Sequence, residues 1–395
     1  MKIGIIGNMN NMYFSLARYL RDEGLNCELL VLADEPLHFD PSCDTYTSDY
    51  KTYCRHVKWG SPSRFLYEDR RTVKSDLGAY DFLIGSGPAP AYAARAGHAL
   101  DVFMPYGHDL YRLPFFPQVL PHHLPAYLSL RHYQRRGIRQ SKSILFDRTN
   151  RAFERIVQKL ACEGQRIVTP LPLFYYKDYE SALTANDPAL PKQTEVERLR
   201  RETDLLIIQH GRQVWKRSLD RWSFKGNDIL FHGFSRFIQQ HPETNIKLLL
   251  LEYGTDVMAS KKMIGQLGLG AYVHWLPQMP RKELMKIVAL SDLVVGELQY
   301  SWLTYGVAIE ALFLGKPLMH KRIDDEFSAD YLELYPMLHA QSPQSVYDGL
   351  VALTTNTASV RKAGRKGRDW FFIHCVQKPI TLVKKLVEQK RLAGL

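Results

Sequence analysis

The sequence has few cysteines and no long apolar run. Its five cysteines are spread over 395 residues, their number is odd, and no two of them form a CxxC pair. These features argue against both a disulfide framework and a cysteine zinc site. No stretch approaches the roughly 18 consecutive apolar residues of a membrane-spanning helix. The first residues also lack the apolar core and cleavage motif of a signal peptide, so we expect a cytoplasmic protein.

Negative charge is the scarcer sign. There are 41 Asp and Glu residues against 52 Lys and Arg residues, which gives a net charge of +11. Such an excess is typical of proteins that bind nucleic acid, anionic membranes or phosphate-bearing ligands. The 45% hydrophobic and 24% charged content is ordinary for a globular chain and excludes a disordered or collagen-like one. The length favours two or three domains of roughly 150 residues each.

Short apolar strands alternate with helical segments in both halves of the chain. In the first half we expect strands at 2–6, 27–32, 80–85, 100–104, 144–145 and 166–169. In the second half we expect strands at 204–209, 247–251, 272–275 and 292–295, and helices at 226–240, 257–267, 281–290 and 306–314. This alternation predicts an α/β fold with two Rossmann-like, doubly wound domains facing a central cleft. The polar, proline-containing stretch 183–196 marks the boundary, so the domains are expected at 1–190 and 197–370.

The most informative pattern lies in segment 291–318. A strand and a loop are followed by Thr304, Tyr305 and Gly306, which lead into a helix that begins near Val307. A glycine at a helix entrance lets a ligand approach closely, and the free N–H groups there favour phosphate. Glu310 lies one turn inside this helix among apolar residues, where a charge without a partner is costly. We therefore expect Glu310 to have a partner, and a ribose diol is within its reach.

Basic residues follow the first strand of the second half. Arg212 comes directly after that strand, and Lys225 stands at the entrance of the next helix. An arginine fork and a lysine point charge together neutralise a diphosphate. Lys216 lies between them and competes with Lys225 for this role, while a solvated basic loop is the alternative interpretation.

Two loops of the first half carry further candidates. His108 and Asp109 follow the strand at 100–104, where the histidine suits proton transfer and the aspartate could orient it or act as a base. Gly7 and Asn8 form the first strand–helix turn. This turn lacks a GxGxxG pattern, so a nicotinamide dinucleotide site is not supported.

Segment 291–318 resembles the donor-site motif of GT-B glycosyltransferases, especially the retaining GT4-like family (glycosyl transferases group 1). The matching residues are Asp292, Gly306, Glu310, Ala311, Gly315 and Pro317. The resemblance implies that Glu310 binds the nucleotide ribose and that the helix start at Thr304, Gly306 and Val307 binds the diphosphate. Arg212 and Lys225 match the basic pair that grips that diphosphate.

The same resemblance extends to the first half and to the C-terminus. It implies that His108 or Asp109 faces the sugar and the acceptor, and that Gly7 and Asn8 border the transferred sugar. It also implies that a helix in 371–395 crosses back onto the first domain. No metal and no cofactor other than the nucleotide-sugar co-substrate is expected, because the arginine, the lysine and the helix end take the place of a metal.

The chain departs from the family pattern at one position. Trp302 stands where the family usually has a second glutamate that places the donor sugar, and Glu297 is a candidate substitute from elsewhere in the loop. The sequence therefore leaves the donor sugar and the stereochemistry open. It also leaves the donor base, the acceptor, the linkage and the oligomeric state open.

The expected function is transfer of a sugar from a UDP- or GDP-linked donor to a hydroxyl group of a glycan or lipid-linked acceptor. Retention and a place in bacterial-type surface polysaccharide or glycoconjugate biosynthesis follow from the resemblance alone. One alternative is a non-hydrolysing sugar-nucleotide 2-epimerase of the same fold. Another is a catalytically silent GT-B protein that binds a membrane or nucleic acid, for which Trp302 gives the reason.

Positive charge gathers in two further segments, 131–142 and 361–368. The first contains Arg131, Arg135, Arg136, Arg139 and Lys142. Because aromatic and leucine residues accompany it, this segment favours an anionic membrane surface, with a solvated helix face as the alternative. We therefore expect a peripheral association with the inner face of the cell membrane. No nucleic-acid-binding signature is present, so a nucleic acid partner is not expected.

Overall fold

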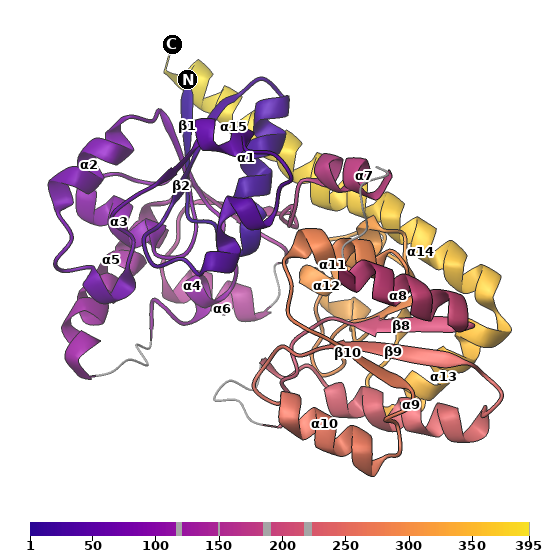
Figure 1. Cartoon of the computed structure of the whole chain (residues 1–395). Helices are drawn as coiled ribbons and strands as arrows, with labels where there is room; N and C mark the ends of the chain where they lie inside the picture. Colours follow the sequence, from indigo (N-terminus) through magenta and orange to yellow (C-terminus); the bar gives the residue numbers. More distant parts are fainter. Residues whose placement is uncertain (116–120, 149–150, 185–190, 217–222, 395) are drawn as a thin grey trace. The chain divides into compact units, whose positions relative to one another are not determined.

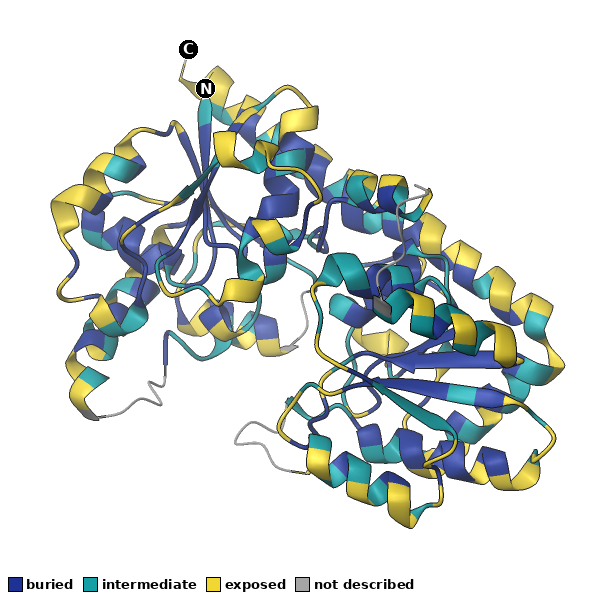
Figure 2. Ribbon diagram, in the orientation of Figure 1, coloured by how far each residue is buried: buried dark blue, intermediate teal, exposed yellow. Residues whose placement is uncertain are grey.

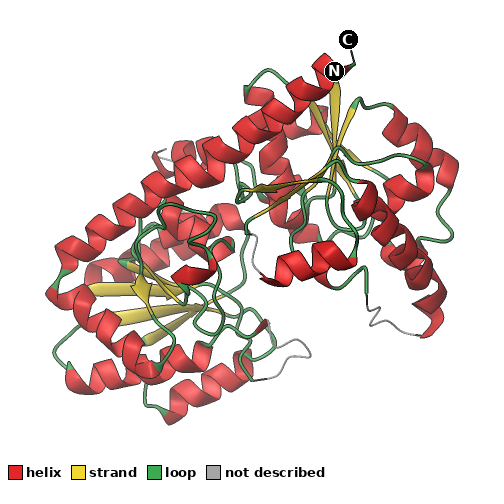
Figure 3. Cartoon of the chain, turned by 180° about the vertical axis from the view of Figure 1, so that it is seen from behind, coloured by secondary structure: helices red, strands yellow, loops and turns green. Residues whose placement is uncertain are grey.

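The computed structural model describes residues 1–115, 121–148, 151–184, 191–216 and 223–394. The chain divides into two compact units (Figure 1). The first consists of Met1–Asp178 together with His374–Leu395, and the second of Tyr179–Ile373. Each unit is a parallel sheet with helices on both faces, which is the α/β class expected from the sequence (Figure 3).

The first unit is built on a seven-stranded parallel sheet in the order β3-β2-β1-β4-β5-β6-β7. Its strands are β1 Lys2–Ile6, β2 Asn26–Val31, β3 Cys54–His56, β4 Phe82–Gly85, β5 Val102–Phe103, β6 Ser143–Phe146 and β7 Gln165–Val168. In the interior strand β1, Ile3 pairs with Cys27 of β2 on one side and with Phe82 of β4 on the other. Strands that are covered on both faces read as continuous apolar runs, and this explains why the sequence located most of them.

Helices cover the first sheet. They are α1 Met12–Asp22, α2 Arg70–Gly78, α3 Ala89–Ala96, α4 His108–Tyr111, α5 Leu124–Gln140, α6 Arg151–Lys159 and α15 Lys378–Ala393. Buried side chains of α2, α3, α5 and α6 form one core with the strands. The C-terminal helix α15 packs on α1 (Figure 1), where Lys384 pairs with Glu23 at 2.6 Å, and Lys390 pairs with the buried Asp101 at 2.7 Å.

The second unit is built on a six-stranded parallel sheet in the order β10-β9-β8-β11-β12-β13. Its strands are β8 Leu205–Gln209, β9 Ile246–Leu251, β10 Val273–Leu276, β11 Leu293–Val295, β12 Leu318–His320 and β13 Leu338–His339. Its helices are α8 Pro191–Glu202, α9 Asn227–Gln240, α10 Val257–Gln266, α11 Arg281–Val288, α12 Gly306–Phe313, α13 Pro343–Thr355 and α14 Thr357–Phe371. Figure 2 shows the central strands of this sheet largely buried, with the exposed residues on the outer faces of the helices.

The predicted strands are present within two residues, but the division between the units differs from the predicted 190/197 boundary. It falls inside α7 (Tyr176–Thr184), between Asp178 and Tyr179. The stretch 183–196 looked like a linker because it is polar and contains prolines. Pro191 instead opens α8, in agreement with the preference of proline for the first helical turn, and α8 packs on α11.

Candidate functional site

The strand order of the second sheet reverses at β8, and we call this place the switch point of the sheet. The chain proceeds from β8 to β9 on one side, and later returns to β11 on the other side. Ligands of open parallel sheets bind beyond the carboxyl ends of the strands at such a point. The loops that follow β8 and β11 therefore form the candidate site of this unit. They contain Arg212, Lys225 and the start of α12.

A buried carboxylate with two basic partners lies at this point. Oε2 of Glu310 lies 2.7 Å from Nε2 of His210, and Oε1 of Glu310 accepts a hydrogen bond of 2.9 Å from Nε of Arg281. Glu310 is 5% exposed and His210 is 6% exposed. His210 follows β8 directly, Arg281 begins α11, and Glu310 lies one turn inside α12, so three separate elements meet here.

The protein partners of Glu310 favour its charged form. Burial raises the pKa of this carboxyl, but the hydrogen bond of His210 and the charge and hydrogen bond of Arg281 outweigh burial and lower it to about 2. Glu310 is thus ionised at neutral pH, and both its oxygens already have a protein partner. The ribose contact expected for Glu310 stays a prediction, which would have to use the second lone pair of an oxygen.

Lys225 and Glu297 form a second largely buried ion pair. Their Nζ and Oε1 atoms lie 2.5 Å apart. Burial raises the pKa of Glu297, and the positive charges of Lys225 and Arg212 oppose that effect. Arg212 therefore lies close enough to Glu297 to act on its charge, and its own side chain is exposed.

The backbone explains how Arg212 and Lys225 come together despite the long segment between them. The N–H of Lys225 donates to the carbonyl oxygen of Val214 at 2.7 Å, so the described ends of that segment meet. The side chain of Asn227, at the start of α9, accepts from the N–H of Val214 and donates to Gln209 at the end of β8. Gly226 precedes it with φ +70°, a conformation that favours glycine.

Lys216, the competitor of Lys225, has a different environment. Its side chain is exposed, and its backbone N–H donates to the carboxylate of Asp256 at 2.8 Å. No carboxylate partner of its ammonium group is found among the described residues. Lys225, in contrast, is held beside Glu297 at the end of β11.

The start of α12 is fixed by Tyr305. The hydroxyl of Tyr305 accepts a hydrogen bond of 2.9 Å from the N–H of Glu297. A Cβ atom at Gly296 would lie 1.9 Å from the same hydroxyl oxygen, so this position requires glycine. The half-buried Thr304 and Gly306 flank Tyr305, whose side chain does not cap the helix.

The first turn of α12 lies against the loop after β8. A Cβ atom at Gly211 would be 3.8 Å from Cγ2 of Val307. The side chain of Tyr305 makes no hydrogen bond to the N–H groups of this turn. These groups lie near the loop that contains Arg212. Such a helix start favours an anion.

In the first unit, the turn after β1 contains Gly7 and Asn8, and the side chain of Asn8 is fully hydrogen-bonded within the protein. Asn8 is fully buried, and its side-chain nitrogen donates to Asn11 and to the carbonyl oxygen of Phe39. Its side-chain oxygen accepts from the N–H of Phe14. Gly7 has φ +91°. These contacts give Asn8 a role in holding the turn, and its predicted sugar contact stays a prediction.

His108 and Asp109 are adjacent in sequence but differ in burial. Asp109 is fully buried, and its carboxylate accepts from the N–H groups of Gly87, Tyr106 and Gly107 at 2.9–3.0 Å. Burial raises the pKa of Asp109 to about 7, against the lowering effect of these donors. His108 is exposed at the start of α4. Of the two, His108 is the side chain that a ligand could reach.

No family model matches this sequence, and no curated protein matches it. Solved structures match over the whole chain. HepE from Anabaena, solved with UDP-glucose, has 16% sequence identity and a TM-score of 0.62, with 100% of each chain covered. Sucrose-phosphate synthase from Thermosynechococcus elongatus has 14% identity and a TM-score of 0.61, again with 100% of each chain covered. UDP-GlcNAc 2-epimerase from Neisseria meningitidis, bound to UDP-GlcNAc, has 12% identity and a TM-score of 0.60, with 98% of this chain and 100% of that chain covered.

The chain has the GT-B fold. The sequence-based prediction of two Rossmann-like domains is thereby confirmed. At these identities the likeness establishes the fold alone, and the roles of individual residues rest on the geometry described above.

Three residues of this GT-B chain escaped the sequence-based assignment of the site. His210 stood in the recognised segment after β8, but nothing local marked it as the partner of Glu310. Arg281 gave no signal, because it begins an ordinary amphipathic helix. Glu35 follows β2, and its Oε1 accepts from the N–H of Asn8 at 2.5 Å. Burial raises the pKa of Glu35 to about 7.

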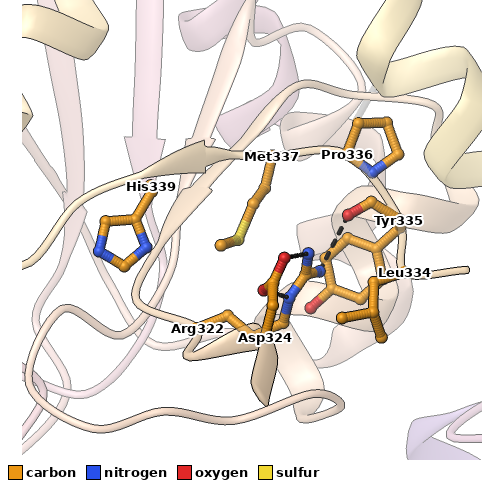
Figure 4. Close-up of a pocket in the computed structure, with 7 residues that line it drawn as sticks. All are labelled: Arg322, Asp324, Leu334, Tyr335, Pro336, Met337 and His339. Atoms are coloured by element: carbon orange, nitrogen blue, oxygen red, sulfur yellow. Dashed lines mark hydrogen bonds and ion pairs between the residues drawn. The ribbon is translucent and has the colours of Figure 1, made fainter. Parts of the chain in front are cut away.

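A hollow of about 470 Å³ lies elsewhere in the second unit of the GT-B fold (Figure 4). Its walls include Arg322 and Asp324, which pair at 2.7 Å, and Tyr335, whose carbonyl oxygen accepts from Arg322 at 2.9 Å. The charge of Arg322 is therefore already compensated within the wall. None of the predicted site residues lines this hollow, so we assign no function to it.

Proposed function

We propose that this chain is a glycosyltransferase that moves a sugar from a UDP- or GDP-linked donor to a hydroxyl group of a glycan or glycolipid. One observation carries the proposal: the buried ion pair of Lys225 and Glu297, with 2.5 Å between Nζ and Oε1, lies at the switch point of the second sheet, where the loop after β8 also contains Arg212. The start of α12, which the side chain of Tyr305 does not cap, belongs to the same switch point. Cations and free N–H groups in one place suit a diphosphate. HepE, which has the same fold, was solved with UDP-glucose, and this supports a nucleotide sugar as the donor.

The reaction needs these groups where charge develops. The bond between the anomeric carbon of the sugar and the diphosphate oxygen breaks, and its electron pair stays on the diphosphate. Arg212, Lys225 and the start of α12 would stabilise that charge in the transition state. The acceptor oxygen bonds to the anomeric carbon and passes its proton to the departing diphosphate oxygen. The exposed His108 is our candidate to face the sugar and the acceptor.

Three finer assignments belong to the proposal. We expect a GT4-like enzyme that retains the anomeric configuration. We expect no need for a metal, because the arginine, the lysine and the helix start supply positive charge. We place the enzyme in bacterial-type surface polysaccharide or glycoconjugate biosynthesis. The first and third rest on the motif around Glu310, and product analysis by NMR with and without a chelator tests the first two.

A thermal-shift screen with UDP, GDP and their sugars tests the donor. A ligand that binds only the folded state at 100 times its Kd adds about 2.7 kcal/mol of stability. We expect at least one of these ligands to raise the Tm, and Arg212→Ala to reduce the shift. Arg198→Ala, which removes an exposed arginine of α8, is the matched control and should leave the shift unchanged. If no nucleotide raises the Tm of the unmodified chain, the proposal is wrong.

A second candidate function is 2-epimerisation of a nucleotide sugar. It is favoured by one comparison, because the Neisseria 2-epimerase shares the fold over 98% of this chain. Incubation with UDP-GlcNAc alone separates the two functions. An epimerised nucleotide sugar without acceptor supports the epimerase, whereas sugar transfer that needs an acceptor supports the transferase. A chain that does neither, and instead binds a membrane or nucleic acid in a salt-sensitive way, is the catalytically silent protein of the same fold.

We also propose that α5 brings the enzyme to an anionic membrane that carries the acceptor. None of the described helices is long and apolar enough to cross a membrane. On α5, Leu124 and Leu128 are 41% and 48% exposed, and Arg136 is exposed further along the helix. Exposed leucines and an exposed arginine on one helix suit the interface of anionic lipids.

Three other basic residues of segment 131–142 already have protein partners, so fewer of them are available to bind lipid. Lys142 pairs with Asp101 at 3.0 Å, the guanidinium of Arg135 lies 5.0 Å from the ring centre of Phe115, and Nε of Arg139 donates to a backbone carbonyl. Cosedimentation with vesicles tests the proposal. Binding to phosphatidylglycerol vesicles but not to phosphatidylcholine vesicles is expected, and Leu128→Glu with Arg136→Glu should abolish it. Equal binding of the variant overturns the proposal.

A further inference from the structure

We infer that His210, held in place by Glu310, accepts a hydrogen bond from a ribose hydroxyl of the bound nucleotide. The inference rests on the proposed function, since it requires a nucleotide at the switch point of the second sheet. It makes His210 the group that touches the ligand. Glu310 then acts as a positioning residue through the histidine.

The first observation is a buried ring nitrogen without a partner. His210 is 6% exposed, and its Nδ1 atom is buried with no hydrogen-bond partner among the residues that the structure describes. An unsatisfied buried polar atom costs free energy, so such atoms in native proteins usually await a ligand, a water molecule or an ion. His210 directly follows β8, and the adjacent Gly211 approaches the first turn of α12. The unpaired nitrogen therefore belongs to the same switch point as Arg212 and Lys225.

The second observation fixes the hydrogen on the ring. Glu310 is ionised, because its partners lower its pKa to about 2, and an ionised carboxylate only accepts hydrogen bonds. Nε2 of His210, 2.7 Å from Oε2 of Glu310, must therefore carry the hydrogen. In the neutral ring this leaves a lone pair on Nδ1, which can only accept. Arg281 supplies the counter-charge of Glu310, with its Nε 2.9 Å from Oε1.

The third step identifies the ligand group. A nitrogen that accepts a hydrogen bond requires a donor group on the ligand. In a nucleoside diphosphate the ribose hydroxyls can donate a hydrogen bond, whereas the ionised phosphates cannot. The same geometry explains why Glu310 is occupied on both oxygens. Its carboxylate orients the histidine, in the way that a carboxylate fixes the tautomer of a metal-binding or catalytic histidine.

The inference is tested by comparing the binding of UDP with that of 2′-deoxy-UDP and 3′-deoxy-UDP. If GDP is the nucleotide that binds, the corresponding guanosine compounds are used. We expect the unmodified chain to bind UDP roughly three- to tenfold more tightly than one of the deoxy forms, the gain of one hydrogen bond. His210→Gln retains an amide N–H within reach of Glu310 but has no acceptor in the place of Nδ1. In this variant the preference for the hydroxyl should disappear, because UDP binding weakens while binding of that deoxy form stays nearly the same.

Two further variants sharpen the result. His210→Asn puts an amide oxygen close to the place of Nδ1 and should restore part of the preference, although it loses the contact with Glu310. His232→Gln changes an exposed histidine of α9 and should leave both affinities unchanged. Circular dichroism and Tm values establish that each variant is folded.

The possible outcomes separate this inference from the proposed function. If the unmodified chain binds UDP and the deoxy forms equally, or if His210→Gln keeps the preference, the inference falls and the donor site stands. If His210→Gln weakens UDP and the deoxy forms equally, the ring contacts a phosphate and the ribose assignment is wrong. If no nucleotide binds to the unmodified chain, the proposed function and this inference fall together.

Discussion

The ammonium group of Lys225 lies 2.5 Å from Oε1 of Glu297, and both side chains are largely buried. A buried ion pair is stable only while both partners are present, because a single buried charge is strongly destabilising. A diphosphate that binds Lys225 therefore either displaces Glu297 from the ammonium group or binds the ammonium group while Glu297 stays in contact with it. The exposed Arg212, which also acts on Glu297, supplies the second cation for such a ligand.

Lys225→Ala should weaken UDP or GDP binding roughly 10- to 100-fold, the effect of one charge-assisted hydrogen bond. Lys216→Ala should change the affinity less than about threefold, because the Lys216 side chain is exposed and lies outside the Glu297 pair. Isothermal titration calorimetry measures both.

Loss of Lys225 also removes the ion-pair partner of the buried Glu297, which should lower the stability of the second unit by about 3–5 kcal/mol. The double variant Lys225→Ala with Glu297→Gln removes that penalty and should still bind weakly. A larger effect of Lys216→Ala than of Lys225→Ala would assign the grip on the diphosphate to Lys216.

Gly296→Ala should destabilise the second unit by about 1–3 kcal/mol or more, because its Cβ atom would lie 1.9 Å from the Tyr305 hydroxyl. Urea unfolding measures the change. Gly265→Ala on α10 is the control: a Cβ atom there meets nothing within 4 Å, and alanine should add about 0.5–1 kcal/mol of stability. If Tyr305→Phe does not relieve part of the Gly296→Ala defect, the clash is not its cause.

The sequence predicted what depends on local pattern. The apolar runs located β1, β2, β8 and β9 because buried parallel strands are continuously apolar. It missed β3 and β13, which are three and two residues long and carry no such run. The sequence also did not predict that the boundary between the two units lies inside α7, because a polar stretch with prolines can be either a linker or the start of a helix.

The site was predictable only in part, for a similar reason. Gly306 and Glu310 lie within one segment and were recognised together. His210 lies 100 residues from Glu310 along the chain, and only the fold brings the two together. Asp109 looked like a candidate base, but a buried carboxylate that accepts three backbone N–H groups cannot be told from a catalytic one by sequence.

His108 and Asp109 should respond differently to substitution. Asp109→Ala leaves the N–H groups of Gly87, Tyr106 and Gly107 without their acceptor, so stability should fall by at least about 2 kcal/mol. His108→Ala should leave the Tm unchanged but slow transfer, since this exposed ring is our candidate to face the sugar and the acceptor. Thermal unfolding and initial rates at saturating donor measure the two effects. An unchanged rate for His108→Ala would remove this residue from the active site.

Glu310→Gln should destabilise the second unit in a pH-dependent way. The folded-state pKa of Glu310 is about 2, below its ordinary value of 4.5, so ionisation favours the folded state. This contribution is about 3 kcal/mol above pH 4.5 and is lost as the pH falls towards 2. The Tm difference between the unmodified chain and Glu310→Gln should therefore be about 6–12 °C at pH 6 and shrink steadily below pH 4.5. Glu388→Gln, which changes an exposed glutamate of α15, should show no such trend. A difference that stays constant from pH 6 to pH 3 would mean that the contacts of Glu310 with His210 and Arg281 do not stabilise the fold.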